Sequence, residues 1–238
     1  MKNNFTIDEV RKFWDGVGDE YDEINGRIGK THHQRFREAS KYLNSLAGQK
    51  ILNVWSRTGE AIPYIRQICP DAEIFNLEVS NEFIKKAKEK FPKENFEETN
   101  LDKFPFEKDS FDYVISLETL EHAPLPLEFL KECRRTLKPE GILIMSLPPK
   151  TAELPLRLYE LFFKNHGEGP HNFLSSKTVK KMIRDAGMEL ITHRGTLLVP
   201  AGPEWLKNFG EKIIEKCQNT PLKEMGIRQF YISKKTNE

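Results

Sequence analysis

The chain has 238 residues, a length that suits one α/β domain with additions better than two full domains. Lysine plus arginine number 37 and aspartate plus glutamate 36, so a broad nucleic-acid-binding surface, which needs a basic surplus on one face, is not expected. The three scattered cysteines form no CxxC pair and fit a reducing compartment, and no stretch reaches the roughly 18 apolar residues of a membrane span. These features predict a cytoplasmic protein without a membrane span or a nucleic-acid partner.

The first 48 residues predict polar helices. Thr6 and Glu9 form a capping box that begins a helix over 6–17, and Gly48 closes a second helix over 30–48. From residue 50 onward, strand-type and helix-type segments alternate. Strands are predicted at 50–55, 72–79, 95–101, 111–117 and 141–148, and helices at 60–69, 81–91 and 126–137.

The predicted strands are mostly apolar, as in a parallel sheet that is covered on both faces. Alternating strands and helices of this kind predict a doubly wound α/β domain. Ligands of such sheets bind at the carboxyl ends of the strands. The candidate site residues therefore follow directly after the strands, at 53–59, 78, 100–102 and 117–122.

Glu78 gives the clearest single signal. It ends the second predicted strand, 19 residues after Gly59. A carboxylate in this place can accept hydrogen bonds from both hydroxyls of a ribose. The alternative is a strand-end acid that faces water, but the strand, turn, helix and spacing together favour the ribose.

Four stretches carry a family resemblance. They are "ILNVWSRTG" (51–59), "FNLEVSNEFIKKAKEKF" (75–91), the segment 98–148 with its "PF…SFDYVIS…LEH…LKPEG" series, and "HNFLSSKTVKKMIRDAGMELI" (171–191). In this order they resemble the class I S-adenosylmethionine (SAM)-dependent methyltransferases, in the branch that includes the quinone-biosynthesis enzymes. The third stretch is the most specific, and the resemblance covers most of the chain.

The resemblance implies a Rossmann-like fold with a seven-stranded, mostly parallel sheet and a last antiparallel strand within 227–235. It divides the chain into an N-terminal helical cap, 1–48, and a methyltransferase domain, 49–238, with helical lid insertions at about 150–172 and 198–226. It also implies SAM as cofactor and a small-molecule, glycan-type or lipid-linked acceptor. We expect a monomer or a homodimer.

The resemblance assigns roles to individual residues. Glu78 would hold the ribose, Asn100 and Leu101 would lie at the adenine, and Leu117 would lie under the cofactor. Tyr21 would close over the cofactor from the N-terminal helices. The remaining residues that we expect at the cofactor are Asn53, Trp55, Arg57, Gly59 and Val79.

The turn after the first strand departs from the family pattern. Asn53 replaces an acid, and Trp55 and Arg57 replace two glycines. Glycine permits a close backbone approach or a positive φ, and Trp55 does neither easily. Its indole is expected either where the methionine half of SAM lies or folded back into the core.

Arg57 leaves three interpretations open. It pairs with the methionine carboxylate, it binds an anionic nucleotide or phosphate ligand near a helix N-terminus, or it points to solvent. SAM is a net cation, and an added guanidinium makes the pocket less attractive to it. Two further functions therefore stand beside methyl transfer: a non-catalytic binding protein on this scaffold, and an enzyme that binds a different nucleotide-type ligand.

The segment "SLETLEHAP" (116–124) holds a second group of polar residues. If the segment is helical, Glu118, Glu121 and His122 share one face and provide ligands for a divalent cation. The alternatives are a structural pair at the start of a helix and a catalytic role, in which His122, with Glu118, acts as general base or orients the substrate.

An apolar segment follows the fifth predicted strand. It predicts a lid over a bulky or lipid-linked acceptor, or packing on the sheet or on a second subunit. Its apolar residues are Leu156, Leu158, Leu161, Phe162 and Phe163.

Overall fold

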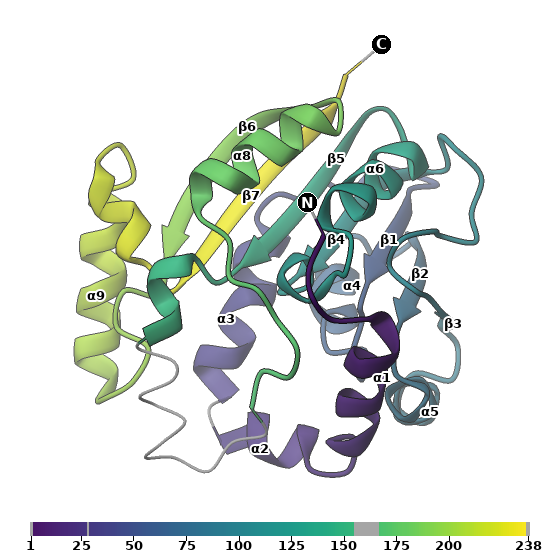
Figure 1. Cartoon of the computed structure of the whole chain (residues 1–238), viewed down its shortest axis with the longest axis horizontal. Coiled ribbons are helices and arrows are strands. Elements are labelled where there is room, and N and C mark those ends of the chain that lie inside the picture. The colour runs from purple at the N-terminus through teal and green to yellow at the C-terminus, as the bar shows by residue number, and fades with distance from the viewer. Residues whose placement is uncertain (1, 28, 155–166, 237–238) are drawn as a thin grey trace.

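The computed structural model describes residues 2–27, 29–154 and 167–236 of the chain. A seven-stranded sheet forms its centre, in the order β3-β2-β1-β4-β5-β7-β6 (Figure 1). The strands are β1 (Lys50–Val54), β2 (Glu73–Glu78), β3 (Asn95–Glu98), β4 (Phe111–Leu117), β5 (Leu137–Leu147), β6 (Met188–Thr196) and β7 (Arg228–Lys235).

The first five strands are parallel, and β7 pairs antiparallel with both β5 and β6. This arrangement confirms the predicted doubly wound, mostly parallel sheet with an antiparallel strand at the end of the chain. Because β1 to β4 run in the same direction, their carboxyl ends meet at one edge of the sheet, which we call the strand-end edge.

Helices cover both faces of the sheet (Figure 1). Leu52, Val54 and Leu143 belong to an apolar layer with residues of α1, α6 and α8, and Ile51, Ile115 and Ile144 belong to a second layer with residues of α3, α4 and α5. The helices are α1 (Ile7–Gly16), α2 (Tyr21–Arg27), α3 (Gly29–Ser40), α4 (Ile62–Ile68), α5 (Asn81–Lys90), α6 (Pro126–Thr136), α8 (Ser176–Asp185) and α9 (Glu204–Lys216), with single 3-10 turns η1 (Leu120–His122), η2 (Lys150–Ala152) and η3 (Pro221–Met225).

The N-terminal helix begins as the sequence predicts. The Thr6 hydroxyl accepts a hydrogen bond from the Glu9 amide, and the Glu9 carboxylate accepts one from the Thr6 amide. The second predicted helix is shorter than expected, since α3 ends at Ser40 rather than near Gly48. There the Ser40 hydroxyl donates to the Arg37 carbonyl, a local bond that competes with helix continuation.

Helix α1 lies along the strand-end edge (Figure 1). Arg11 fixes it there, since its guanidinium donates to the Val79 carbonyl at 3.2 Å and to Asn100 Oδ1 at 2.7 Å. The Ser80 hydroxyl also donates to Asp15 at 2.6 Å. A helix therefore covers the side of the sheet on which ligands of this fold bind.

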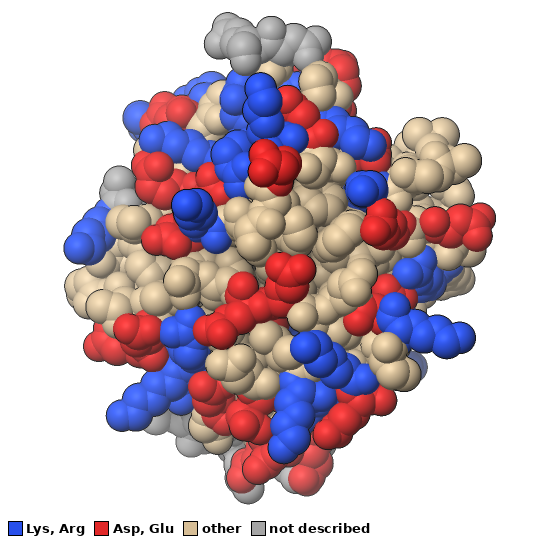
Figure 2. All heavy atoms as spheres, turned by 90° about the vertical axis from the view of Figure 1, so that its right-hand side faces the viewer, with Lys and Arg blue, Asp and Glu red and all other residues tan. Residues whose placement is uncertain are grey.

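Figure 2 shows basic and acidic side chains interspersed on one face of the molecule, without a broad basic surface there. Among the described residues, no helix is long and apolar enough to cross a membrane. The predicted apolar lid residues, 156–163, lie outside the described residues. The second predicted insertion, 198–226, contains α9 and η3 and lies between β6 and β7.

Candidate functional site

The turn after β1 has the backbone of a glycine-rich turn without most of its glycines. Trp55 and Arg57 have φ values of 57° and 54°, and Gly59 has 85°. The Ser56 amide donates to the Leu77 carbonyl of β2 at 2.9 Å, which ties the turn to the sheet. Trp55 and Arg57 thus take the positive φ that glycine adopts readily, at a cost of roughly 1–2 kcal/mol for each.

The side chains of this turn are buried. The Arg57 guanidinium carbon lies 3.7 Å from the ring centroid of Trp55 and 4.1 Å from that of Trp14. Arg57 is 6% exposed and Trp55 is 3% exposed. The interpretation that Arg57 points to solvent is therefore wrong, because two indoles hold the cation by cation–π contacts. One of its terminal nitrogens, Nη1, is buried and has no hydrogen-bond partner among the described residues.

His122 completes this aromatic group. Its ring centroid lies 4.8 Å from Trp55 and 5.8 Å from Trp14, and its Nδ1 is 2.9 Å from the Pro170 carbonyl. A carbonyl only accepts, so Nδ1 carries the proton and Nε2 is the free acceptor. Burial, with the charge of Arg57, lowers the pKa of His122 to about 3, far below that of a base suited to neutral pH.

Glu78 lies under the same turn and is fully buried. Its carboxylate accepts hydrogen bonds from the backbone amides of Arg57 at 2.6 Å, Val79 at 2.7 Å and Ser80 at 3.0 Å. Burial raises the pKa of Glu78 to about 7, while Arg57 and these amides act in the opposite direction. The acid predicted to hold a ribose thus organises the two loops that would surround one.

The other predicted cofactor residues lie along the same edge. The Asn53 amide donates to Asn76 Oδ1 on β2 at 2.9 Å, so it pairs within the sheet. Asn100 is exposed and bound by Arg11, while Leu101, with φ of 64°, and Leu117 are buried.

Tyr21 packs against Phe83 with 4.7 Å between ring centroids, and its hydroxyl donates to Glu60 at 3.2 Å. It is 2% exposed. Tyr21 therefore lies between the N-terminal helices and the sheet, as part of the apolar layer next to Trp14.

Glu118 does not share a helical face with Glu121 and His122, so that premise is wrong. Glu118 has a φ of 56°, and only Leu120–His122 form a single 3-10 turn. The Glu118 carboxylate accepts from Arg35 and from Arg228, each at 2.5 Å. Burial alone would raise the pKa of Glu118, but the two guanidinium groups hold it well below its usual range.

Glu121 is 1% exposed, and neither of its carboxylate oxygens has a hydrogen-bond partner among the described residues. Burial raises its pKa well above the usual value, and the charge of Glu118 adds to this shift. Within the described part of the chain, no group of three His, Cys, Asp or Glu side chains is placed to hold a metal ion. Glu118, Glu121 and His122 are therefore not arranged to bind the predicted divalent cation in the described structure.

Comparison with known proteins agrees with this architecture. A family model described as a methyltransferase domain matches residues 52–145. The demethylmenaquinone methyltransferase of Staphylococcus aureus (strain JH9) is 30% identical over 169 residues, which cover 68% of this chain and 70% of that protein. The chain belongs to the class I SAM-dependent methyltransferases.

Two further proteins illustrate the extent of the likeness. The demethylmenaquinone methyltransferase of Lactococcus lactis is 25% identical over 213 residues, covering 79% of this chain and 84% of that protein. A complex of the Haloferax volcanii Trm112 methyltransferase activator with a methyltransferase superposes with a TM-score of 0.74 at 18% identity, over 96% of this chain and 98% of that chain. The second match concerns the fold alone.

The residues predicted at the cofactor are largely engaged within the protein. Glu78 is fully buried and accepts three backbone hydrogen bonds, and Asn100 accepts one from Arg11. Trp55 and Arg57 fill the space over the turn that glycines would leave open, and Arg57 adds a cation there. The methionine half of SAM therefore does not fit the described arrangement.

Sequence reasoning missed Trp14 and Arg11, both on α1. The spacing of Val10 and Trp14, four residues apart on an amphipathic helix, is the signal for the buried face of this helix. Nothing in the sequence shows that this face packs on the turn at residues 55–57. Arg35 and Arg228, which hold Glu118, were also missed, because they come from α3 and from β7 at the far end of the chain.

Substitution of His122 by Gln is expected to flatten the pH dependence of stability. The pKa of His122 is about 3 in the folded protein and about 6.5 unfolded, so its contribution is present above pH 6.5 and is lost as the pH falls. Between pH 7 and pH 5 the wild type should lose about 2 kcal/mol more than the variant. Urea unfolding of both proteins at the two pH values measures this difference, and equal losses would show that His122 is not buried in its neutral form.

Proposed function

We propose that this methyltransferase acts on a quinone-type, lipid-linked aromatic acceptor. The observation that carries this proposal is the aromatic group at the strand-end edge. Trp14, Trp55 and His122 lie in mutual ring contact, and His171 follows 6.2 Å from His122. Once Arg57, which now covers both indoles, moves aside, such rings would stack on a planar aromatic acceptor, whereas a glycan needs a lining richer in polar groups. The two demethylmenaquinone methyltransferase relatives support the same acceptor class.

His122 would orient this acceptor. Its Nδ1–H donates to the Pro170 carbonyl, so Nε2 is left to accept a hydrogen bond from an acceptor hydroxyl. With its pKa lowered to about 3, it orients the hydroxyl rather than removing its proton. Positioning of this kind supplies a large part of the rate in transfer reactions.

A second function has its own support in the turn. Arg57 packs on Trp14 and Trp55 in the turn after β1, where these side chains would occupy the space of the methionine half of SAM. A protein that keeps this arrangement would bind an aromatic ligand without turnover. Methyl transfer requires that the side chains of Trp55 and Arg57 move away from the turn when SAM binds. Ligand binding without turnover does not require this movement.

The test is incubation of the purified protein with SAM carrying a labelled methyl group and with a reduced naphthoquinone bearing a short isoprenoid tail. We expect a methylated naphthoquinol by mass spectrometry and no product from a sugar acceptor. The control Leu46→Ser changes an exposed residue before β1, at the opposite end of that strand, and should methylate like the wild type. Binding of the quinol without methylation would favour the second function.

A further inference from the structure

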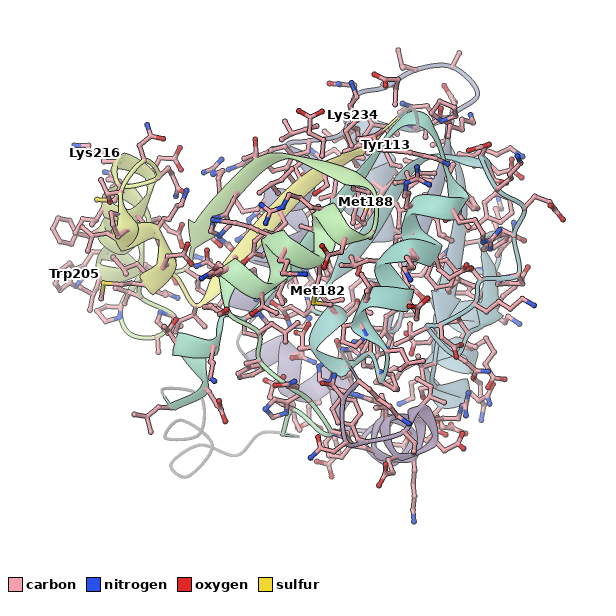
Figure 3. The ribbon with its side chains drawn as sticks, turned by 45° about the horizontal axis from the view of Figure 1, so that its top comes forward. Tyr113, Met182, Met188, Trp205, Lys216 and Lys234 are labelled. Carbon is pink, nitrogen blue, oxygen red and sulfur yellow. The ribbon has the colours of Figure 1, made fainter. Side chains whose placement is uncertain are left out.

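Helix α9 presents an apolar face that the described residues do not cover. Trp205, Phe209 and Ile213 follow one another at intervals of four residues and are 69%, 56% and 36% exposed. The opposite side of the helix, with Gly210 and Ile214, is buried against the rest of the protein. Figure 3 places Trp205 and Lys216 on α9 at the outer edge of the molecule, away from the sheet.

Two lysines of α9 lie on a different side of the helix from its acidic residues. Lys212 and Lys216 follow Trp205 by seven and eleven residues, so they lie on the same face as the apolar stripe. Both are exposed, and neither forms an ion pair within the described part of the chain. The exposed apolar face thus carries basic charge only.

The acidic residues of α9 lie on another side and are engaged. Glu204 pairs with Lys30 and Lys207, and Glu215 pairs with Arg194. Glu211 accepts a hydrogen bond from the Leu197 amide at 2.8 Å. They therefore leave the charge of the exposed face uncompensated.

The neighbouring turn η3 adds two exposed apolar side chains. Leu222 and Met225 of η3 are 50% and 61% exposed, and η3 packs beside α9. The patch formed by α9 and η3, which we call the α9 face, consists of Trp205, Phe209, Lys212, Ile213, Lys216, Leu222 and Met225.

We propose that the α9 face docks on an anionic lipid bilayer. An amphipathic helix with Trp and Phe on its apolar side and lysines beside them binds in the interface of membranes that carry acidic lipids. A second copy of this chain fits less well, because the lysines of the two α9 faces would repel one another across the interface. The proposal deepens the proposed function, on which its biological purpose rests, because a lipid-linked acceptor resides in the bilayer.

The segment before α9 is linked by hydrogen bonds to the candidate site. The Thr31 hydroxyl at the start of α3 donates to the Pro200 carbonyl just before α9, at 3.2 Å. Arg228 of β7 donates to the Thr31 carbonyl at 3.3 Å and also to Glu118 beside the aromatic group. Hydrogen bonds through Thr31 and Arg228 therefore link the segment before α9 to the segment that carries His122.

The test is co-sedimentation of the full chain with vesicles of phosphatidylcholine alone and with vesicles containing phosphatidylglycerol. We expect binding to the anionic vesicles that is roughly tenfold tighter than to the neutral ones and that weakens with salt. Trp205→Ser/Phe209→Ser and Lys212→Glu/Lys216→Glu should each lose roughly tenfold in binding. Lys85→Glu/Lys88→Glu, on the exposed side of α5, is the matched charge control and should bind as the wild type does.

The mutated side chains are exposed, so unchanged thermal unfolding confirms that each variant is folded. The proposal is overturned if the wild type binds no vesicle, or if the Trp205/Phe209 variant binds as well as the wild type. It is also overturned if light scattering shows that the wild type is a dimer and the Trp205/Phe209 variant a monomer, while the wild type binds no vesicle. Sedimentation does not depend on methyl transfer, so a failed quinol assay with normal vesicle binding would overturn the proposed function and not the docking surface.

Discussion

Substitution of both Trp55 and Arg57 by glycine should tighten the binding of SAM by roughly two orders of magnitude. In the described structure the ligand must first displace two buried side chains, and apparent affinity falls by the fraction of molecules that are open. Removal of Arg57 also removes a positive charge that would repel the net positive charge of SAM. Titration calorimetry with SAM on both proteins measures the effect, and we expect weak binding by the wild type and micromolar binding by the variant.

S-adenosylhomocysteine separates the two contributions, because it lacks the sulfonium charge. Arg57→Gln removes the charge and keeps most of the volume, so it should improve SAM binding more than S-adenosylhomocysteine binding. Trp55→Gly empties space and should improve both. Loss of Trp55 from the core costs about 3–5 kcal/mol, partly offset by relief of the positive φ, so urea unfolding must accompany the titrations.

Micromolar binding of SAM by the wild type, with no gain in the double variant, would contradict the prediction. The turn would then be rebuilt around the cofactor, and Nη1 of Arg57, which has no partner within the described part of the chain, would bind the methionine carboxylate. An unchanged absence of binding in the double variant would instead place the obstacle elsewhere, at Trp14 or at the fully buried Glu78.

The sheet could be predicted from sequence because its signals are local. Apolar strands of five to seven residues alternate with amphipathic helices, and β1, β2 and β4 lie within two residues of their predicted ends. The start of β5 at Leu137 was missed, because Pro139 and Gly141 in "KPEG" predict a turn. Pairing with β4 at Phe111 overrides that local preference.

The sequence could predict where in the fold the candidate site lies, but not how its side chains are arranged. Its residues follow the strands, as expected, but the conformation of Glu118 depends on Arg35 and Arg228, which lie 83 and 110 residues away in the chain. The position of Arg57 likewise depends on Trp14, from a helix that the sequence does not connect with the turn. Contacts of this range carry no periodic signal, so a helical spacing of Glu118 and His122 suggested a shared face that does not exist.

Replacement of Glu118 by Ala should destabilise the fold by about 3 kcal/mol or more. Its carboxylate, 21% exposed, neutralises the guanidinium groups of Arg35 and Arg228, whose side chains are 6% and 9% exposed. Removing one partner of such an ion pair leaves uncompensated buried charge, which costs more than the pair itself contributes. Urea unfolding at pH 7 measures the loss. The matched control Glu128→Ala removes a pair with Lys131 in which both side chains are 49% exposed, and it should change stability by less than about 0.5 kcal/mol.

The pH dependence of this loss gives an independent check. The folded pKa of Glu118 lies below its unfolded value, so its stabilisation is present above about pH 4.5 and is lost as the pH falls toward the folded pKa. Glu118→Gln keeps the size of the side chain but cannot titrate, so the gap between wild type and variant should narrow on acidification below pH 4.5. A gap that stays constant from pH 7 to pH 3 would mean that packing, rather than charge, explains the role of Glu118. The left-handed backbone at this residue would then be held by its neighbours and not by its two arginine partners.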